Sequence, residues 1–285
     1  MVQTPVGDPE GIGVPPDRLC KLPVFRPVAI RLLSVLAQED VEISEVTGLL
    51  NSDPAFIAEI LTLSNSSLYA RQTRIDTVQR AIMCLGLERT RAFAATVALH
   101  GMVCALKSKD AVQDCWQHSR AAAIIAEWLA PFWRLHPEQS YTAALMHDIG
   151  RLGMLSAYPD YPNLLATATG SPHDLLAREQ SSFSVNHCQA GMWLTRIWGL
   201  PEEFGAAASQ HHEPLTATPS DRVDLIRFSC AFAESMGFKP ATKVDCVPVE
   251  DLVARIPDTV LPRSRFSLDR LSDRLWKELQ ADAEA

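Results

Sequence analysis

The stretch from Tyr141 to Arg151 delivers a histidine and an aspartate side by side at the end of a run of small, helix-favouring residues. Neighbouring side chains on a helix point about 100° apart, so one buried face cannot hide both His147 and Asp148. Burying an imidazole and a carboxylate without polar partners is costly. We therefore expect this helix to stop at Gly150, and the fold to bring polar groups or a shared cation to the pair.

Other histidines surround this pair along the chain in a regular order. His118 lies upstream, while His187 and the adjacent His211 and His212 lie downstream. Asp114 precedes His118 by four residues, so the two share a face if the segment is helical. Helical bundles build internal metal sites from such positions on facing helices. The predicted metal ligands are His118, His147, Asp148, His187, His211 and His212.

This donor set suits a first-row transition metal. Neutral imidazoles with one or two carboxylates favour iron, manganese, zinc or nickel and are poor ligands for calcium or magnesium alone. The number of donors is sufficient for one ion or for two. Because such a metal can lower the pKa of a water molecule to about 7, the site could serve phosphoester hydrolysis as well as structure or sensing. These alternatives stay open at this point.

Competing interpretations apply to other residues that could carry chemistry. Nucleophile motifs of the GxSxG type, P-loops and GxGxxG fingerprints are absent from the sequence. Cys188 follows His187 directly, but without a partner CxxC it is a weak candidate ligand. Four tryptophans fall at helical spacing and are expected in the core: Trp116, Trp133, Trp193 and Trp198.

The hydrophobic pattern predicts an all-α chain in four parts. Residues 1–18, rich in proline and glycine, are expected to form a flexible leader. Residues 19–106 are expected to form a module of about five helices, because no strand-like alternation interrupts their helical periodicity. Residues 107–239 are expected to form a second helical block, which carries all the predicted metal ligands. Residues 240–285 are expected to be irregular up to Ser267 and to end in an amphipathic helix.

Composition indicates a soluble cytoplasmic protein. The 285 residues are 47% hydrophobic and 21% charged, and the net charge of −8 comes without any run of lysines and arginines. This charge argues against nucleic acid as a partner. No apolar run approaches the roughly 18 residues of a spanning helix, and the seven cysteines form no regular framework. We therefore expect no membrane contact and reduced thiols.

Several motifs together resemble the HDOD family, over residues 20 to 237. They include Asp53-Pro54-Ala55, the turn ending at Leu85-Gly86, the run from Ala144 to Gly150, and the segment from Trp198 to Glu202. HDOD modules are relatives of the HD phosphohydrolases and the HD-GYP phosphodiesterases, and they are all-α, bacterial and usually regulatory. The resemblance implies an N-terminal helical module packed on an HD-like bundle. It also implies metal ligation by the same six residues.

Three departures from the family pattern count against an active enzyme. Cys230 occupies the position of a closing aspartate, and Arg151 replaces the lysine of the HDIGK form. Arginine can still hold a phosphate, although with a different reach. No GYP-type loop follows His212, so cyclic di-guanylate hydrolysis is not expected. Asp114 stands where HD-GYP enzymes often carry a glutamate ligand.

The resemblance favours a bacterial signalling protein that acts through contacts with other proteins and carries one or two metal ions in its histidine cluster. The alternative is a metal-dependent phosphohydrolase or phosphodiesterase that acts on a phosphate-containing small molecule. In that case Asp148 and Arg151 would be the catalytic residues. A third possibility is a metal-free scaffold in which the histidines are remnants.

Overall fold

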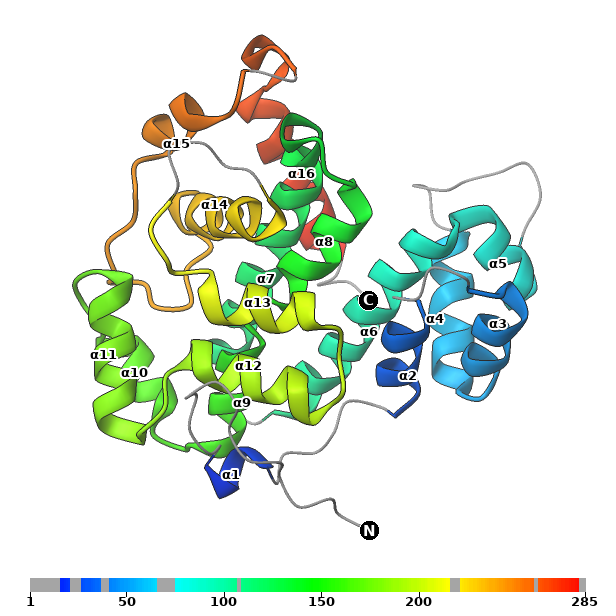
Figure 1. Ribbon diagram of the computed structural model, residues 1–285, viewed down its shortest axis with the longest axis horizontal. Helices are drawn as coiled ribbons and strands as arrows, with labels where there is room; N and C mark the ends of the chain where they lie inside the picture. The colour runs from blue at the N-terminus through cyan, green and yellow to red at the C-terminus, as the bar shows by residue number, and fades with distance from the viewer. Residues whose placement is uncertain are drawn as a thin grey trace.

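The computed structural model describes residues 16–20, 27–36, 41–65, 75–106, 109–215, 221–258 and 261–281. Within these ranges all regular structure is helical, apart from one isolated bridge between Gly170 and Val244. The predicted all-α class is therefore confirmed (Figure 1). Residues 1–15 of the predicted leader lie outside the described residues, and a first short helix, α1, already begins within its predicted range, at Asp17.

The helices between residues 27 and 105 form a small module beside the main bundle, whereas the short helix Asp17–Cys20 lies against the bundle (Figure 1). In the described part of this range the chain forms five helices. The helix starting at Pro54 has Asp53 before it, whose carboxylate accepts from the Phe56 amide at 3.5 Å. The next helix is capped by Thr77, whose side chain accepts from the Arg80 amide. The bounds are α1 (Asp17–Cys20), α2 (Pro27–Val35), α3 (Ile43–Asn51), α4 (Pro54–Ser64), α5 (Val78–Leu85) and α6 (Leu87–Ala105).

The second group of helices forms a bundle around α7, which contacts α8, α9, α14 and α16. The four tryptophans expected in the core are all buried. The bounds are α7 (Lys109–Leu129), η1 (Ala130–Trp133), α8 (Pro137–Met146), α9 (Ile149–Ala157), α10 (Tyr161–Thr167), α11 (Pro172–Phe183), α12 (His187–Ile197), α13 (Glu202–Gln210) and α14 (Arg222–Ser235).

Helix α9 is the main difference from the sequence-based expectation. The glycine-containing segment after Asp148 was expected to end the helical run, but Gly150 is the second residue of α9. The chain makes only a brief turn at His147 and Asp148 and then continues as a helix. Gly150 allows α9 to pack closely against α12 and does not end the helical run.

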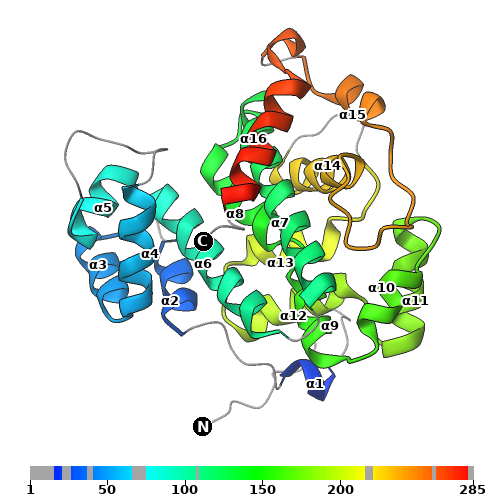
Figure 2. The same ribbon diagram turned by 180° about the vertical axis from the view of Figure 1, so that it is seen from behind.

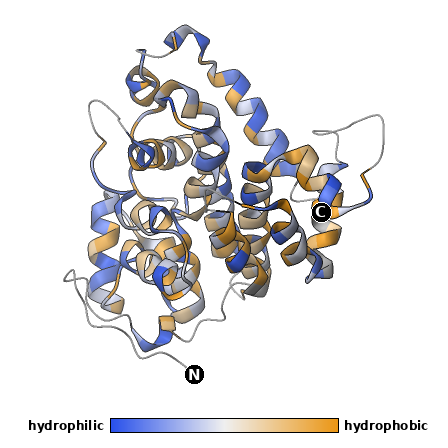
Figure 3. Cartoon of the chain, turned by 45° about the vertical axis from the view of Figure 1, so that its right-hand side comes forward, coloured by the Kyte–Doolittle hydropathy of each residue, from blue (hydrophilic) through white to orange (hydrophobic). Residues whose placement is uncertain are grey.

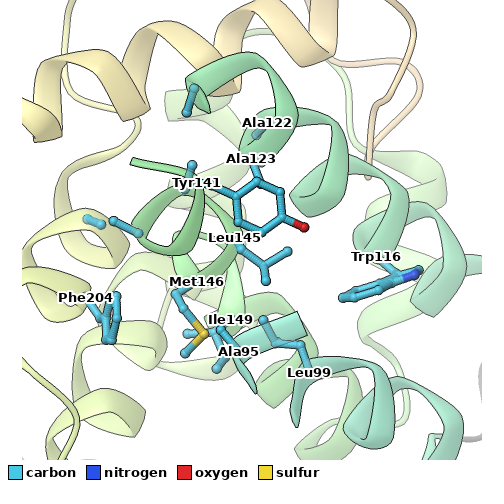
Figure 4. Packing of buried hydrophobic residues seen from close by; sticks show 14 of the residues in the cluster. Ala95, Leu99, Trp116, Ala122, Ala123, Tyr141, Leu145, Met146, Ile149 and Phe204 are labelled. Atoms are coloured by element: carbon cyan, nitrogen blue, oxygen red, sulfur yellow. The ribbon is translucent and has the colours of Figure 1, made fainter. Parts of the chain in front are cut away.

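The module and the bundle share one continuous apolar core. Figure 4 shows Ala95 and Leu99 of α6 close to Met146 and Ile149 of the bundle. Polar contacts close the edge of this junction: the buried Arg91 of α6 forms an ion pair with Glu203 of α13. The predicted boundary between the two parts lies at residue 107. Residues 107 and 108 lie outside the described ranges.

The C-terminal segment crosses back to the bundle. It contains α15 (Val249–Arg255), η2 (Arg263–Arg265) and α16 (Leu268–Ala281), and α16 lies along α7 (Figure 2). Helix α16 buries Leu271 and Leu275, as its amphipathic pattern predicts, and leaves Trp276 exposed. Most helices carry both hydrophobic and hydrophilic residues along their length (Figure 3). None of the described helices combines the length and hydropathy needed to cross a bilayer.

Candidate metal centre

Five side chains from five helix positions meet inside the bundle. His118 lies in the middle of α7, His147 ends α8, Asp148 precedes α9, His187 begins α12, and His211 follows α13. Each of the five residues is only 1–2% exposed. Positions at helix ends bring the donors in from different directions, so residues up to 93 positions apart in the sequence converge on one interior point.

Close packing of α9 on α12 makes this convergence possible. A β-carbon placed on Gly150 would lie 1.8 Å from the carbonyl oxygen of His187 and 2.6 Å from the amide nitrogen of Gly191. The two helix backbones therefore touch at this point, and only glycine fits there. This contact holds the start of α12, and with it His187, against the residues that follow Asp148.

His118 and His147 turn the same ring nitrogen toward each other. The Nδ1 atom of His118 lies 2.8 Å from the Phe238 carbonyl oxygen, and that of His147 lies 2.5 Å from the Ala144 carbonyl oxygen. A carbonyl oxygen can only accept, so each Nδ1 carries the ring hydrogen. The two Nε2 atoms, 3.2 Å apart, then face each other as bare lone pairs.

At neutral pH neither ring gains a second hydrogen that could form a hydrogen bond between the two Nε2 atoms. Burial, followed by the neighbouring His147 ring, lowers the pKa of His118 to about 3. Burial likewise lowers the pKa of His147. Because both rings are neutral with their single hydrogens on Nδ1, no hydrogen lies between the two Nε2 atoms. A cation bound between them would satisfy both lone pairs.

His187 differs from the other histidines because a carboxylate holds it. Glu179 accepts from both the His187 amide, at 2.9 Å, and its Nδ1, at 2.6 Å. Burial and the Arg151 charge oppose protonation of the ring, but the Glu179 carboxylate outweighs them and the pKa of His187 is raised to about 10. A carboxylate on the far nitrogen of a metal-binding histidine is a common arrangement, which fixes the ring and makes it a better donor.

His187, His211 and Asp148 form a triangle of donor atoms. The Nε2 atoms of His187 and His211 are 3.3 Å apart, and each lies 3.7 Å from Oδ1 of Asp148. A point equidistant from all three corners lies about 2.1 Å from each, the length of a zinc–nitrogen or zinc–oxygen bond. Burial and the neighbouring His212 ring lower the pKa of His211 well below its usual value, so its Nε2 is a free donor. Its Nδ1 donates to the Ala208 carbonyl at 2.9 Å.

Asp148 Oδ1 is itself evidence for a missing positive partner. Among the described residues it is a buried oxygen with no hydrogen-bond donor. The other oxygen, Oδ2, accepts from Nε of Arg151 at 2.7 Å. Burial opposes ionisation, but the Arg151 and His187 charges lower the pKa of Asp148, so the group is a carboxylate. The donor set and this unsatisfied oxygen both fit a transition-metal ion.

Arg151 is directed into the cluster. Besides Asp148, its guanidinium contacts Tyr161 OH at 3.4 Å, Glu179 at 3.5 Å and Nε2 of His212 at 3.3 Å. The residue is 2% exposed and borders a small cavity of about 10 Å³, which holds about one water molecule. Its hydrogen-bonding capacity is thus largely used within the protein.

The remaining predicted site residues lie at the margin. His212 uses its Nε2 lone pair for Arg151 and lines the cavities beside the cluster. Cys230 lies with its sulfur 3.6 Å from Nε2 of His118, and burial, followed by Glu234, raises the pKa of its thiol well above the usual value. Asp114, one turn before His118, is partly exposed, and no described hydrogen bond or ion pair joins it to the cluster.

A cavity of about 170 Å³ adjoins the cluster on one side. Its lining includes His212 and Cys188 beside the predicted metal ligands, and His173, Gln189 and Glu213 nearer the surface. It is the larger of the two cavities found next to the cluster in the described chain. A small polar molecule could approach the cluster from this side, past His212.

The sequence analysis did not identify Glu179, whose carboxylate contacts His187, Tyr161 and Arg151 beside the cluster. Glu179 lies four residues after the buried Leu175 of α11, so it occupies the apolar face of an amphipathic helix. A carboxylate on such a face needs a buried partner, and this signal was available in the sequence. Tyr161, which donates to Glu179 at 2.7 Å, gave no comparable signal.

Comparison with known proteins places this fold in a family. The model of the HDOD domain matches residues 22–214. The chain belongs to the HDOD family. This HDOD chain is 23% identical, over 90% of its length, to an uncharacterized protein of Treponema pallidum (strain Nichols), of which it spans 47%.

Solved structures share the fold of this HDOD chain. An HDOD domain protein of unknown function from Geobacter sulfurreducens matches over 92% of both chains, with 23% identity and a TM-score of 0.71. A putative phosphohydrolase from Shewanella amazonensis SB2B also matches over 92% of both, with 21% identity and a TM-score of 0.65. A putative signal transduction protein from Marinobacter aquaeolei VT8 has 20% identity and a TM-score of 0.67, over 93% of this chain and 60% of that one. At these identities the likeness concerns the fold.

Proposed function

We propose that this HDOD protein is a regulatory module that binds a transition-metal ion in the cluster of His118, His147, Asp148, His187 and His211, and that acts through contacts with other proteins. The main observation that supports metal binding is the orientation of the histidine rings. Nδ1 atoms donate to fixed oxygens at four histidines, and the Nε2 atoms lie in two pairs 3.2 and 3.3 Å apart. Beside the second pair lies Oδ1 of Asp148, a buried carboxylate oxygen with no hydrogen-bond donor among the described residues, and one positive ion could satisfy all three atoms.

An ion held there would tie the bundle together. Its nearest donors, His187, His211 and Asp148, come from the start of α12, the end of α13 and the turn before α9. Iron, manganese, zinc or nickel would suit these nitrogen and oxygen donors. Because metal binding is coupled to folding when the ligands come from separate helices, occupancy would set the stability of the whole second block. Stability that depends on a metal is a property suited to sensing.

The regulatory role is supported by how little of the cluster a substrate could reach. The five donors are 1–2% exposed, and Arg151, the residue expected to hold a phosphate, is engaged with Asp148, Glu179 and His212. Exposed apolar side chains such as Met83 and Trp276, at 67% and 55% exposure, are available for contacts with a signalling partner.

The test begins with metal content and stability. Protein purified without an affinity tag should contain close to one equivalent of a first-row metal by elemental analysis, and removing it with a chelator should lower the melting temperature. Asp148→Ala should lose most of the metal. Less than a tenth of an equivalent in the parent, after growth with added metals, would support the remnant interpretation and refute ours.

A second candidate, a metal-dependent phosphohydrolase or phosphodiesterase, is favoured by the cavity of about 170 Å³ beside His212 and Cys188. A bound metal would supply a nucleophile from water at neutral pH. His212 would then face the substrate, and Asp148 would orient the attacking group. A panel of nucleotides and generic phosphodiesters tests this role. Turnover that is lost in Asp148→Ala would favour the enzyme, whereas no turnover by the metal-loaded parent would favour regulation.

A further inference from the structure

The two oxygens of the Asp148 carboxylate face different groups. Its Oδ1 faces His187 and His211, and its Oδ2 faces His118 at 4.0 Å while accepting from Arg151 at 2.7 Å. Beyond His118 lie His147 and the sulfur of Cys230, and the potential ligand atoms of these three residues all lie within 4.8 Å of one another. The donors therefore fall into two groups, one on each side of Asp148.

The Arg151 side chain binds the second of these oxygens, Oδ2, at 2.7 Å. Its Nε donates to Oδ2 of Asp148, and its Nη2 donates to Nε2 of His212. Asp148 and His212 both belong to the predicted set of metal ligands. A second ion would need Oδ2, and the guanidinium would have to leave before that oxygen could bind it.

The charges of these groups also disfavour the binding of a second ion. Arg151 is balanced by two carboxylates, Asp148 and Glu179. A single divalent ion beside these three groups already leaves one excess positive charge in a buried place. A second divalent ion would add two more within a few ångströms of the guanidinium, where repulsion is weakly screened.

We propose that Arg151 acts as a built-in cation that takes the place of a second metal ion, so that this chain holds one ion, at His187, His211 and Oδ1 of Asp148. This inference rests on the proposed metal binding and specifies its stoichiometry. Removal of the guanidinium frees Oδ2 of Asp148 and Nε2 of His212, and opens the group of His118, His147 and Cys230 to a second ion.

The experiment compares metal equivalents in the 285-residue parent and three variants after saturation with zinc and removal of excess ion. Arg151→Met removes the charge and keeps much of the side-chain length. Arg151→Lys keeps the charge. Arg91→Met removes another buried arginine, which pairs with Glu203 away from the cluster. We expect two equivalents in Arg151→Met and one in the parent and the other two variants.

Two equivalents in the parent, or one in a natively folded Arg151→Met, would overturn the role of Arg151 and leave metal binding intact. No zinc in the parent would instead refute the proposed function, and the present inference with it. The two failures are thus distinguishable.

Cobalt provides a test that does not depend on the folding of Arg151→Met. Titration of the metal-free parent with Co²⁺ should saturate at one equivalent. Cys188 lies beside His187 and His211, so it could give a thiolate-to-cobalt charge-transfer band, but any such band should be the same in Cys230→Ala, because Cys230 lies in the group that Arg151 keeps closed. A second equivalent, or such a band that disappears in Cys230→Ala, would overturn the proposal. If Arg151→Met folds, it should show a band that depends on Cys230, and Arg151→Met with Cys230→Ala should lack it.

Discussion

Gly150 and His187 are in backbone contact: a β-carbon on the glycine would lie 1.8 Å from the histidine's carbonyl oxygen. The contact joins α9, which follows Asp148, to the first residue of α12. The positions of Asp148 and His187, two of the proposed metal ligands, thus depend on the absence of one methyl group. The same contact explains why the chain has glycine at this position, inside a helix where glycine is otherwise unfavourable.

Gly150→Ala should therefore separate α9 from α12. The obstructing atoms are backbone, which cannot rotate away, so we expect a loss of at least about 3 kcal/mol in unfolding free energy. Urea denaturation with a metal assay measures both consequences. Gly48→Ala is the matched control, because Gly48 lies in a helix with nothing within 4 Å of a β-carbon, and it should stabilise by up to about 1 kcal/mol. Equal effects of the two substitutions would contradict the proposed contact.

Glu179→Gln should weaken zinc binding to the neutral His187 ring, that is, the affinity corrected for proton competition, by about 10- to 100-fold, the usual effect of losing the partner of a metal-binding histidine. The amide can still accept from Nδ1 of His187, but it carries no charge. Competition with a chromophoric chelator gives the affinity. Tyr161→Phe removes a hydroxyl from the same carboxylate without removing its charge, and it should cost much less. A corrected Glu179→Gln affinity equal to that of the parent would show that Glu179 does not support a ligand.

Zinc binding should release one proton per ion near pH 7. The raised pKa of His187, about 10, means that the metal-free ring is protonated there, and the ion must displace that proton from Nε2. His118, His147 and His211 have lowered pKa values and are already neutral. The apparent affinity should therefore rise about tenfold per pH unit from pH 7 to pH 9.

Calorimetry in buffers of different ionisation enthalpy counts this proton directly. In Glu179→Gln the pKa of His187 should fall, and both the released proton and the rise in affinity above pH 7 should largely disappear. An affinity that is already constant above pH 7 in the parent would contradict the charged state assigned to His187.

Glu203→Ala should destabilise the junction between the N-terminal module and the bundle. It removes the ion-pair partner of Arg91, whose side chain is 6% exposed, and of Arg222, whose side chain is 25% exposed, at a total cost of about 3 kcal/mol. Asp76→Ala removes the partner of Arg80 in a pair whose side chains are 53% and 69% exposed, and it should cost less than about 1 kcal/mol. Urea midpoints of the two variants that do not differ would refute the importance of the buried pair.

Much of this fold follows from local patterns. The proline after Asp53 marks the start of α4, and the leucine stripe of α16 predicts the buried face that the structure has. The helical segments carrying His118, His147 and His187 were also predictable, because each has a clear periodicity or break beside it. Local signals of this kind do not depend on the tertiary structure.

The unpredicted features depend on contacts between distant segments. Gly150 signals a helix end when seen locally, and only its contact with His187 shows why it lies inside α9. Arg151 suggests a phosphate contact by its position in the motif, yet its partners in the fold are Asp148, Glu179 and His212. A side chain of that length can reach several places, and the packing of α11 and α13 decides among them.

The account depends most on the triangle formed by His187, His211 and Asp148. Crystals of the parent protein grown with zinc and measured at the zinc absorption edge would locate the ion by its anomalous signal. We predict one strong peak, about 2.1 Å from Nε2 of His187, Nε2 of His211 and Oδ1 of Asp148. An empty triangle at full zinc saturation, or a peak only at surface residues, would contradict the account.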